Sequence, residues 1–174
     1  MTLQHVLKAL TEAGLVGTKL IPSSFKPTVS VAAKFSKGGA VDLGNTIAIK
    51  DSQDAPLIEV DSEGSKDSSY VICMMDPDAK SRQEPIWAPF AHWVSSTPDL
   101  SVKPQLEYMG PAPPPGTGPH RYVLLAYAEA NKGATQLTVS KEDRKNFPIE
   151  DFVSKNKLEL VGANFFYAED KSKE

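Results

Sequence analysis

The chain has 174 residues, of which 40% are hydrophobic and 24% are charged, so it suits one globular domain with a sizeable core. Its formal net charge of −3 provides no basic field for nucleic acid, and its single cysteine, Cys73, excludes a disulfide within the chain. No apolar run approaches the roughly 18 residues of a membrane span and no signal-peptide pattern begins the sequence, so we expect a cytoplasmic protein.

The first predicted element is an amphipathic helix over residues 3–13, with Thr2 as its N-cap. Its apolar residues recur at helical spacing and form one stripe: Leu3, Val6, Leu7 and Leu10. Two roles stay open, because such a stripe either covers one end of the domain or docks in the groove of a partner protein. We treat residues 1–17 as an N-terminal helical extension and residues 18–174 as the main domain.

Short strands dominate the rest of the sequence. Alternating or continuous apolar runs predict strands at residues 29–35, 40–49, 56–60, 69–75, 90–96, 105–109, 121–128 and 158–168. A second helix is predicted over residues 149–155, because Pro148 suits the first turn of a helix. The charges from Lys141 to Lys145 alternate in sign, and we interpret this cluster as a solvated face. The pattern predicts a mainly β protein, a sandwich around a central antiparallel sheet with a few short peripheral helices.

A proline-rich loop, residues 108–122, is the most restrictive feature of the sequence. It contains five prolines and three glycines, so it forms neither a helix nor a regular strand. Because each proline restricts its own φ and pushes the preceding residue toward extended geometry, we expect a stiff loop. The loop ends in His120, Arg121 and Tyr122, and it therefore delivers a histidine and a tyrosine to the start of the next strand.

A second motif begins where the predicted strand 69–75 ends. The segment Asp76–Arg82 has the composition of a turn, in which the first carboxylate can accept from an N–H two residues ahead. Trp87 and Phe90 follow this turn, and His92 lies in the next predicted strand. The two motifs thus place an acidic turn and two histidines at the ends of strands.

Together, these motifs resemble the two signatures of the phosphatidylethanolamine-binding protein family, also called the Raf kinase inhibitor family. The first family signature is an Asp-Pro-Asp-Ala-Pro-Ser-Arg turn followed by a histidine, and the second is a Gly- and Pro-rich loop that ends in His-Arg-Tyr. The resemblance covers about residues 20–168 and implies the β-sandwich of that family. Residues 107–114 and 160–169, together with the N-terminal extension, are similar to the fungal carboxypeptidase Y inhibitors within the family.

The resemblance implies a small pocket for an anion such as phosphate or a phospholipid headgroup. Its residues, carried over motif by motif, are Asp76, His92, Pro114, His120 and Tyr122 as binding groups, Ala112 and Pro113 in the wall, and Trp87 and Phe90 at the rim. A carboxylate beside a histidine orients the imidazole and raises its pKa, which favours the cation that an anion prefers. Lys80 stands where the family has proline, so we expect a trans peptide bond before it and a reshaped lip.

Three functions are compatible with such a pocket. The first is a cytoplasmic inhibitor of a serine carboxypeptidase, the second is a phospho-ligand sensor that acts on a protein kinase, and the third is a weak hydrolase that uses Asp76, His92 and His120. We favour a binding protein over an enzyme, because no nucleophile has an activating context. We expect a monomer without metal, cofactor or nucleic-acid partner, and with at most peripheral membrane contact.

Overall fold

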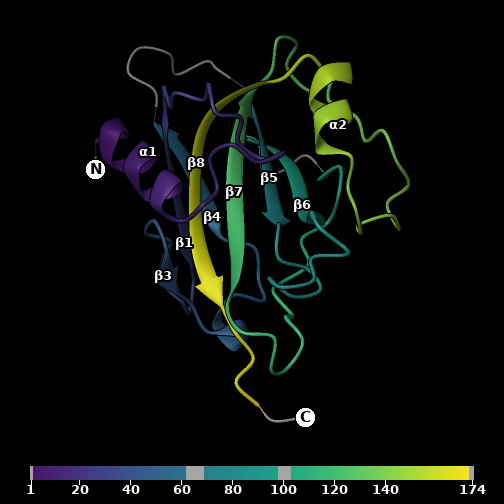
Figure 1. Cartoon of the computed structure of the whole chain (residues 1–174). Helices are drawn as coiled ribbons and strands as arrows, with labels where there is room; N and C mark the ends of the chain where they lie inside the picture. Colours follow the sequence, from purple (N-terminus) through teal and green to yellow (C-terminus); the bar gives the residue numbers. More distant parts are fainter. Residues whose placement is uncertain (1, 62–68, 98–102, 173–174) are drawn as a thin grey trace.

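The computed structural model describes residues 2–61, 69–97 and 103–172. Within these residues, two β-sheets pack face to face and two short helices lie at the periphery (Figure 1). The helices are α1 (Leu3–Glu12) and α2 (Ile149–Lys155), and a 3-10 helix covers Ile49–Asp51. The strands are β1 (Ser30–Phe35), β2 (Gly39–Ala40), β3 (Asn45–Thr46), β4 (Leu57–Asp61), β5 (Tyr70–Asp76), β6 (Phe90–Thr97), β7 (His120–Ala128) and β8 (Glu159–Ala168). The predicted mainly β sandwich is confirmed.

One edge of the larger sheet collects the ends of three strands. The larger sheet has the strand order β3-β8-β7-β5-β6, and the smaller sheet has the order β2-β1-β4. Strand β5 lies between β6 and β7 and is antiparallel to both. The C-terminal end of β5 therefore meets the N-terminal ends of β6 and β7, which places Asp76, Phe90 and His120 together at what we call the pocket edge.

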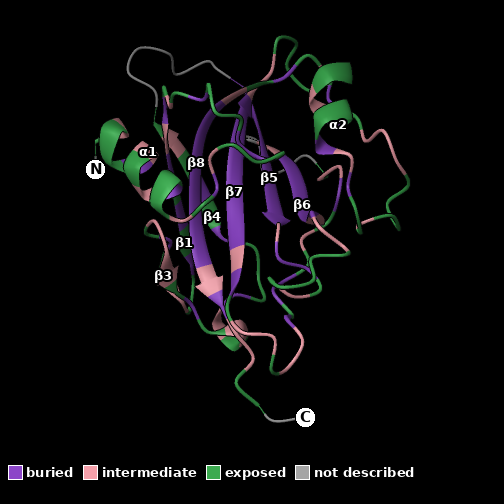
Figure 2. Ribbon diagram, in the orientation of Figure 1, coloured by how far each residue is buried: buried purple, intermediate pink, exposed green. Residues whose placement is uncertain are grey.

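Both faces of the larger sheet are buried, and alternate side chains enter different cores. From β5, Cys73 and Met75 enter a helix-side core, whereas Ile72 and Met74 enter an inter-sheet core between the two sheets. Figure 2 shows the middle strands buried over almost their whole length, while α1 and α2 expose their outer faces. Strands that are buried on both faces read as continuous apolar runs, which is why β5 and β7 were recognisable in the sequence.

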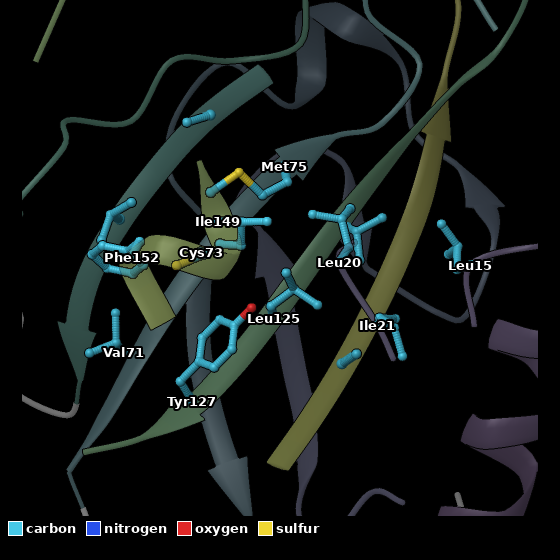
Figure 3. Packing of buried hydrophobic residues seen from close by; sticks show 14 of the residues in the cluster. Leu15, Leu20, Ile21, Val71, Cys73, Met75, Leu125, Tyr127, Ile149 and Phe152 are labelled. Carbon is cyan, nitrogen blue, oxygen red and sulfur yellow. The ribbon is translucent and has the colours of Figure 1, made fainter. Parts of the chain in front are cut away.

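The N-terminal helix contributes Val6 and Leu10 to the helix-side core. Leu15, Leu20 and Ile21 from the following segment and Ile149 and Phe152 from α2 belong to the same core (Figure 3). From its apolar stripe, Val6 and Leu10 are only 2% and 0% exposed, whereas Leu3 and Leu7 are half-buried. The helix therefore covers the domain, which is the first of its two predicted roles. Docking of this helix to a partner stays a prediction, and its exposed apolar surface would come from the half-buried Leu3 and Leu7. The domain division at residue 17 also stays a prediction.

Two predicted strands are wrong. Residues 40–49 form the end of β2 and the short β3, because Leu43 and Gly44 turn the backbone through positive φ angles of 43° and 103°. Residues 105–109 form an isolated bridge between Leu106 and Val94 instead of a strand. Pro104 and Pro111 flank this segment and lack an N–H for strand pairing, and apart from the bridge the Met109 N–H donates to the His92 carbonyl at 2.8 Å.

Asn164 in β8 ties the two sheets together through its side-chain amide. Its Nδ2 donates to the carbonyls of Val31 and Val41, at 2.9 Å and 3.1 Å. Its Oδ1 accepts from the backbone N–H groups of Leu43 and Phe165, at 3.0 Å and 2.8 Å. One buried amide thus satisfies backbone groups of β1, of β8 and of the turn before β3.

We predict that Asn164→Leu lowers the free energy of unfolding by about 3 kcal/mol, because several buried backbone groups lose their partners while the volume stays similar. For a domain of this size, the melting temperature should fall by roughly 10 °C. Urea and thermal denaturation measure both quantities. The control is Asn131→Leu in an exposed turn, and a loss for Asn164→Leu no larger than that of the control would contradict the bridging role.

Candidate functional site

A pocket with a volume of about 100 Å³ opens at the pocket edge. It is lined by Asp76, Ala79, Lys80, Trp87, Phe90, His92, Met109, Ala112, Pro113, Pro114, His120 and Tyr122. Every pocket residue that the sequence motifs predicted is therefore in this lining. Ala79 and Met109 were missed, although both lie beside motif residues in the sequence, and Lys80 was noticed only as a departure from the family pattern.

Asp76 and His120 form a buried pair in the pocket wall. Asp76 Oδ2 lies 2.9 Å from His120 Nδ1, and the two residues are 3% and 1% exposed. The second imidazole nitrogen, Nε2, lies 3.0 Å from Thr117 Oγ1, and the Thr117 hydroxyl donates to the carbonyl of Pro114 at 2.7 Å. Both nitrogens of His120 are therefore engaged by the protein, and the ring is held against the proline-rich loop.

The second carboxylate of the turn, Asp78, connects the pocket edge to the N-terminal helix. Its Oδ2 accepts from the backbone N–H and from Nε of Arg121, both at 2.9 Å, and its Oδ1 accepts from Nη2 at 2.7 Å. Arg121 Nη1 donates to the carbonyl of Ala13 at the end of α1, at 2.8 Å. One arginine thus joins the turn after β5, the start of β7 and the end of α1.

His92 faces the pocket from β6 and is neutral over most of the physiological pH range. Its Nδ1 lies 2.7 Å from the carbonyl oxygen of Met109, and the Met109 N–H donates to the His92 carbonyl at 2.8 Å. Burial lowers the pKa of His92 and outweighs the opposing effect of the Met109 carbonyl. This direction is opposite to the raised histidine pKa that we expected from a nearby carboxylate. The hydrogen bond to Met109 assigns the proton to Nδ1 and leaves Nε2 as an acceptor.

Arg144 braces the same wall from a distant part of the sequence. Its Nη1 donates to the carbonyl of His92 at 3.0 Å, and its Nη2 donates to the carbonyl of Glu107 at 2.8 Å. The interpretation of Lys141–Lys145 as a solvated face is therefore wrong for Arg144. The charge pattern could not reveal this role, because the carbonyls that Arg144 binds belong to segments far away along the chain.

Tyr122 forms the floor of the pocket and carries an unused donor. The residue is 0% exposed, and its ring centroid lies 5.4 Å from that of Phe166 and 5.3 Å from that of His92. Among the described residues, the buried hydroxyl has no hydrogen-bond partner. Burial, together with the nearby Asp76 and Asp78 carboxylates, raises the pKa of Tyr122, so the side chain stays a neutral phenol that can donate its proton to a ligand oxygen.

The lip of the pocket differs from the sequence expectation. The peptide bond between Ala79 and Lys80 is cis, so the prediction of a trans bond was wrong, and the Ala88–Pro89 bond is also cis. The N–H of Trp87 donates to the carbonyl of Ala79 at 2.9 Å, which fixes the indole beside the turn. Lys80 is exposed and lines the pocket.

A larger open groove lies on the helix side of the molecule. Its volume is about 890 Å³, and it is lined by residues from 17–26, from α2 and from 157–160. This groove includes none of the predicted site residues and no histidine, so it offers fewer groups for acid–base chemistry or anion binding than the smaller pocket.

Across the described ranges, no group of three or more His, Cys, Asp and Glu side chains is arranged to hold a metal ion. The same ranges include no helix of the length and apolarity needed to cross a membrane.

Comparisons with known proteins agree with the motifs. A family model described as phosphatidylethanolamine-binding protein matches residues 31–166. The chain is 29% identical to the carboxypeptidase Y inhibitor of Saccharomyces cerevisiae, over 97% of this chain and 96% of the relative. The crystal structure of a carboxypeptidase Y inhibitor complexed with the cognate proteinase is similar at a TM-score of 0.83 and 27% identity, covering 97% of this chain and 96% of that one. A phosphatidylethanolamine-binding protein from Plasmodium vivax is similar at a TM-score of 0.77 and 25% identity, covering 95% of this chain and 97% of that one.

We predict that the buried His92 makes the protein less stable in acid. Because its pKa is lower in the folded state than the ordinary value of 6.5, the unfolded chain binds more protons, and stability is lost as the pH falls below that value. The substitution His92→Asn keeps a side-chain N–H for Met109. The free energy of unfolding of wild type should exceed that of His92→Asn by most at pH 7–8, and this difference should shrink toward pH 5. Urea denaturation across this range measures it, with His5→Asn on the exposed side of α1 as the control. A pH-independent difference would show that protonation of His92 is not involved.

Proposed function

The chain belongs to the phosphatidylethanolamine-binding protein family, and from this premise we propose that it is a non-enzymatic inhibitor of a serine carboxypeptidase with a small anion pocket. The observation that carries the proposal is the similarity to a carboxypeptidase Y inhibitor over 97% of this chain, in sequence and in fold. That similarity extends beyond residues 31–166, which the family model matches, and so takes in the N-terminal segment as well.

The N-terminal helix offers a surface that could contact the proteinase. Val6 and Leu10 anchor α1 in the core, and Arg121 binds the carbonyl at its C-terminal end. The helix is thus held in place while Leu3 and Leu7 stay half-buried. A rigidly presented helix face with apolar anchors is a recurring mode of binding to a partner's groove.

We predict that the wild-type chain inhibits purified carboxypeptidase Y and that the double variant Leu3→Ser/Leu7→Ser inhibits about tenfold more weakly, as expected for loss of interface anchors. Inhibition constants measure the effect, and circular dichroism checks that the variant is folded. Deletion of residues 1–17 is a poorer test, because it also removes Val6 and Leu10 from the core.

The matched control is Gln4→Ser/Lys8→Ser, which changes exposed polar residues of the same helix. An inactive wild type would exclude carboxypeptidase Y as a target. Unchanged inhibition by Leu3→Ser/Leu7→Ser would instead assign the contact to another surface.

The anion part of the proposal rests on the donors and charges in the pocket. Tyr122 supplies a buried O–H without a partner in the described structure. The Asp76 carboxylate is held by hydrogen bonds, because its Oδ1 accepts from the Asp78 N–H at 2.7 Å and its Oδ2 lies 2.9 Å from His120 Nδ1. The volume of about 100 Å³ suits a group of the size of phosphate. A compact anion would thus find a donor at the floor and a carboxylate that is already hydrogen-bonded in the wall.

We predict that Tyr122→Phe weakens the binding of inorganic phosphate about tenfold, because a hydrogen bond to a charged group is lost. The melting temperature should stay the same or rise, since the variant removes a buried hydroxyl that the free protein leaves unsatisfied. Calorimetric titration and thermal denaturation measure the two effects. Tyr70→Phe at the opposite end of β5 is the control, and equal phosphate affinity of Tyr122→Phe and wild type would exclude this donor.

The other two hypotheses have less support. A hydrolase would need a free general base, whereas Asp76 and Thr117 engage both ring nitrogens of His120 and the Thr117 hydroxyl donates to the Pro114 carbonyl. No contact, charge or cavity of the described residues favours a kinase over a proteinase as partner. Both hypotheses therefore stay predictions from the sequence.

A further inference from the structure

Two exposed lysines flank the indole at the mouth of the pocket. Lys80 Nζ lies 5.8 Å and Lys145 Nζ lies 4.0 Å from the centroid of the Trp87 ring. Lys80 and Trp87 both line the pocket. The salt bridges within the described ranges involve neither lysine. Two ammonium groups without a salt-bridge partner in those ranges therefore lie beside Trp87, although only Lys80 belongs to the pocket lining itself.

Backbone hydrogen bonds through Trp87 bring the two lysines together. The Trp87 N–H donates to the carbonyl of Ala79, the residue before Lys80, at 2.9 Å. The Trp87 carbonyl accepts from the N–H of Asn146, the residue after Lys145, at 3.0 Å. Trp87 thus joins two segments that are far apart in the sequence. Its two backbone hydrogen bonds hold the backbone next to Lys80 and next to Lys145 close to the indole.

The interior of the pocket adds hydrogen-bonding groups. The Asp76 carboxylate lies 2.9 Å from His120 Nδ1, and Tyr122 contributes a neutral hydroxyl. The buried His92 donates its Nδ1–H to Met109. Lys80 brings a positive charge to the pocket lining, and Lys145 brings a second one against the Trp87 indole, which belongs to the same lining.

We propose that Lys80 and Lys145 make this pocket selective for a phosphomonoester dianion over a phosphodiester monoanion. The inference rests on the proposed anion pocket and adds the class of its ligand. At pH 8 a phosphomonoester carries nearly two negative charges, since its second pKa is about 6, whereas a diester carries one. The electrostatic attraction of each ammonium group to the ligand is stronger when the ligand carries two negative charges. Contacts of exposed lysines with an indole are weak, so these side chains can move from Trp87 to a ligand. A phosphodiester headgroup such as that of phosphatidylethanolamine is then the poorer ligand.

The test compares phenyl phosphate with methyl phenyl phosphate by calorimetric titration at pH 8. We expect wild type to bind the monoester about fivefold more tightly, the order expected for screened charges near a surface. In Lys80→Gln/Lys145→Gln, the affinity for the monoester should fall about tenfold and the preference should disappear. The control is Lys37→Gln/Lys132→Gln, which has the same net charge but changes lysines in exposed turns outside the pocket lining.

The outcomes separate the inference from the proposed function. A wild type that binds neither probe overturns both the anion pocket and the inference. Equal affinity for the two probes, or a preference that survives in Lys80→Gln/Lys145→Gln, overturns the inference alone. Flotation with vesicles of phosphatidylcholine and phosphatidic acid identifies the source of the monoester: capture by phosphatidic acid indicates a lipid headgroup, and binding of phenyl phosphate alone indicates a soluble ligand.

Discussion

The buried ion pair between Asp78 and Arg121 is the interaction on which the arrangement of the pocket edge depends. A carboxylate that is 1% exposed needs a charged and hydrogen-bonded partner, and Arg121 provides three N–H groups to it. The same guanidinium binds Ala13 at the end of α1. Because Asp76 and His120 are close neighbours of these residues in the sequence, the pair also brings the carboxylate and imidazole of the pocket wall together. The pocket and the N-terminal helix are thus held by one arginine.

In the proposed anion pocket, shape and charge would be recognised by different groups. Its floor is a packed aromatic surface with the neutral hydroxyl of Tyr122, and its walls hold the Asp76 carboxylate and the buried His92. Lys80 at its lip and Lys145 beside Trp87 carry positive charge. A small oxyanion would therefore be oriented by a buried donor and attracted by exposed ammonium groups. Because the side chains of Lys80 and Lys145 are exposed, we expect their substitution to change the preferred class of ligand without disturbing the fold.

The proposed inhibitor surface and the pocket belong to one connected structure. The turn after β5 contributes Asp76 and Lys80 to the pocket and Asp78 to the anchor of α1. The helix in turn contributes Val6 and Leu10 to the core under the larger sheet. Its half-buried leucines are therefore presented from a fixed base, which lowers the entropy that binding to a partner would cost.

Local patterns in the sequence were sufficient for the features that depend on neighbouring residues. The helical spacing of α1, the continuous apolar runs of β5 and β7, and the two motifs identified the sandwich and the predicted pocket lining. Motif residues such as Asp76 and His120 lie at strand ends, and antiparallel neighbours bring such ends to one edge.

Which groups are buried, and which partners they bind, follows from the folded structure and not from local sequence patterns. It buried Val6 but not Leu7, lowered the pKa of His92, and directed Arg144 to the carbonyls of the pocket wall. It also placed Lys145 beside the indole that Lys80 approaches. The physical reason is that propensity and periodicity act over a few residues, whereas desolvation and hydrogen bonding depend on segments that approach one another only in the folded chain.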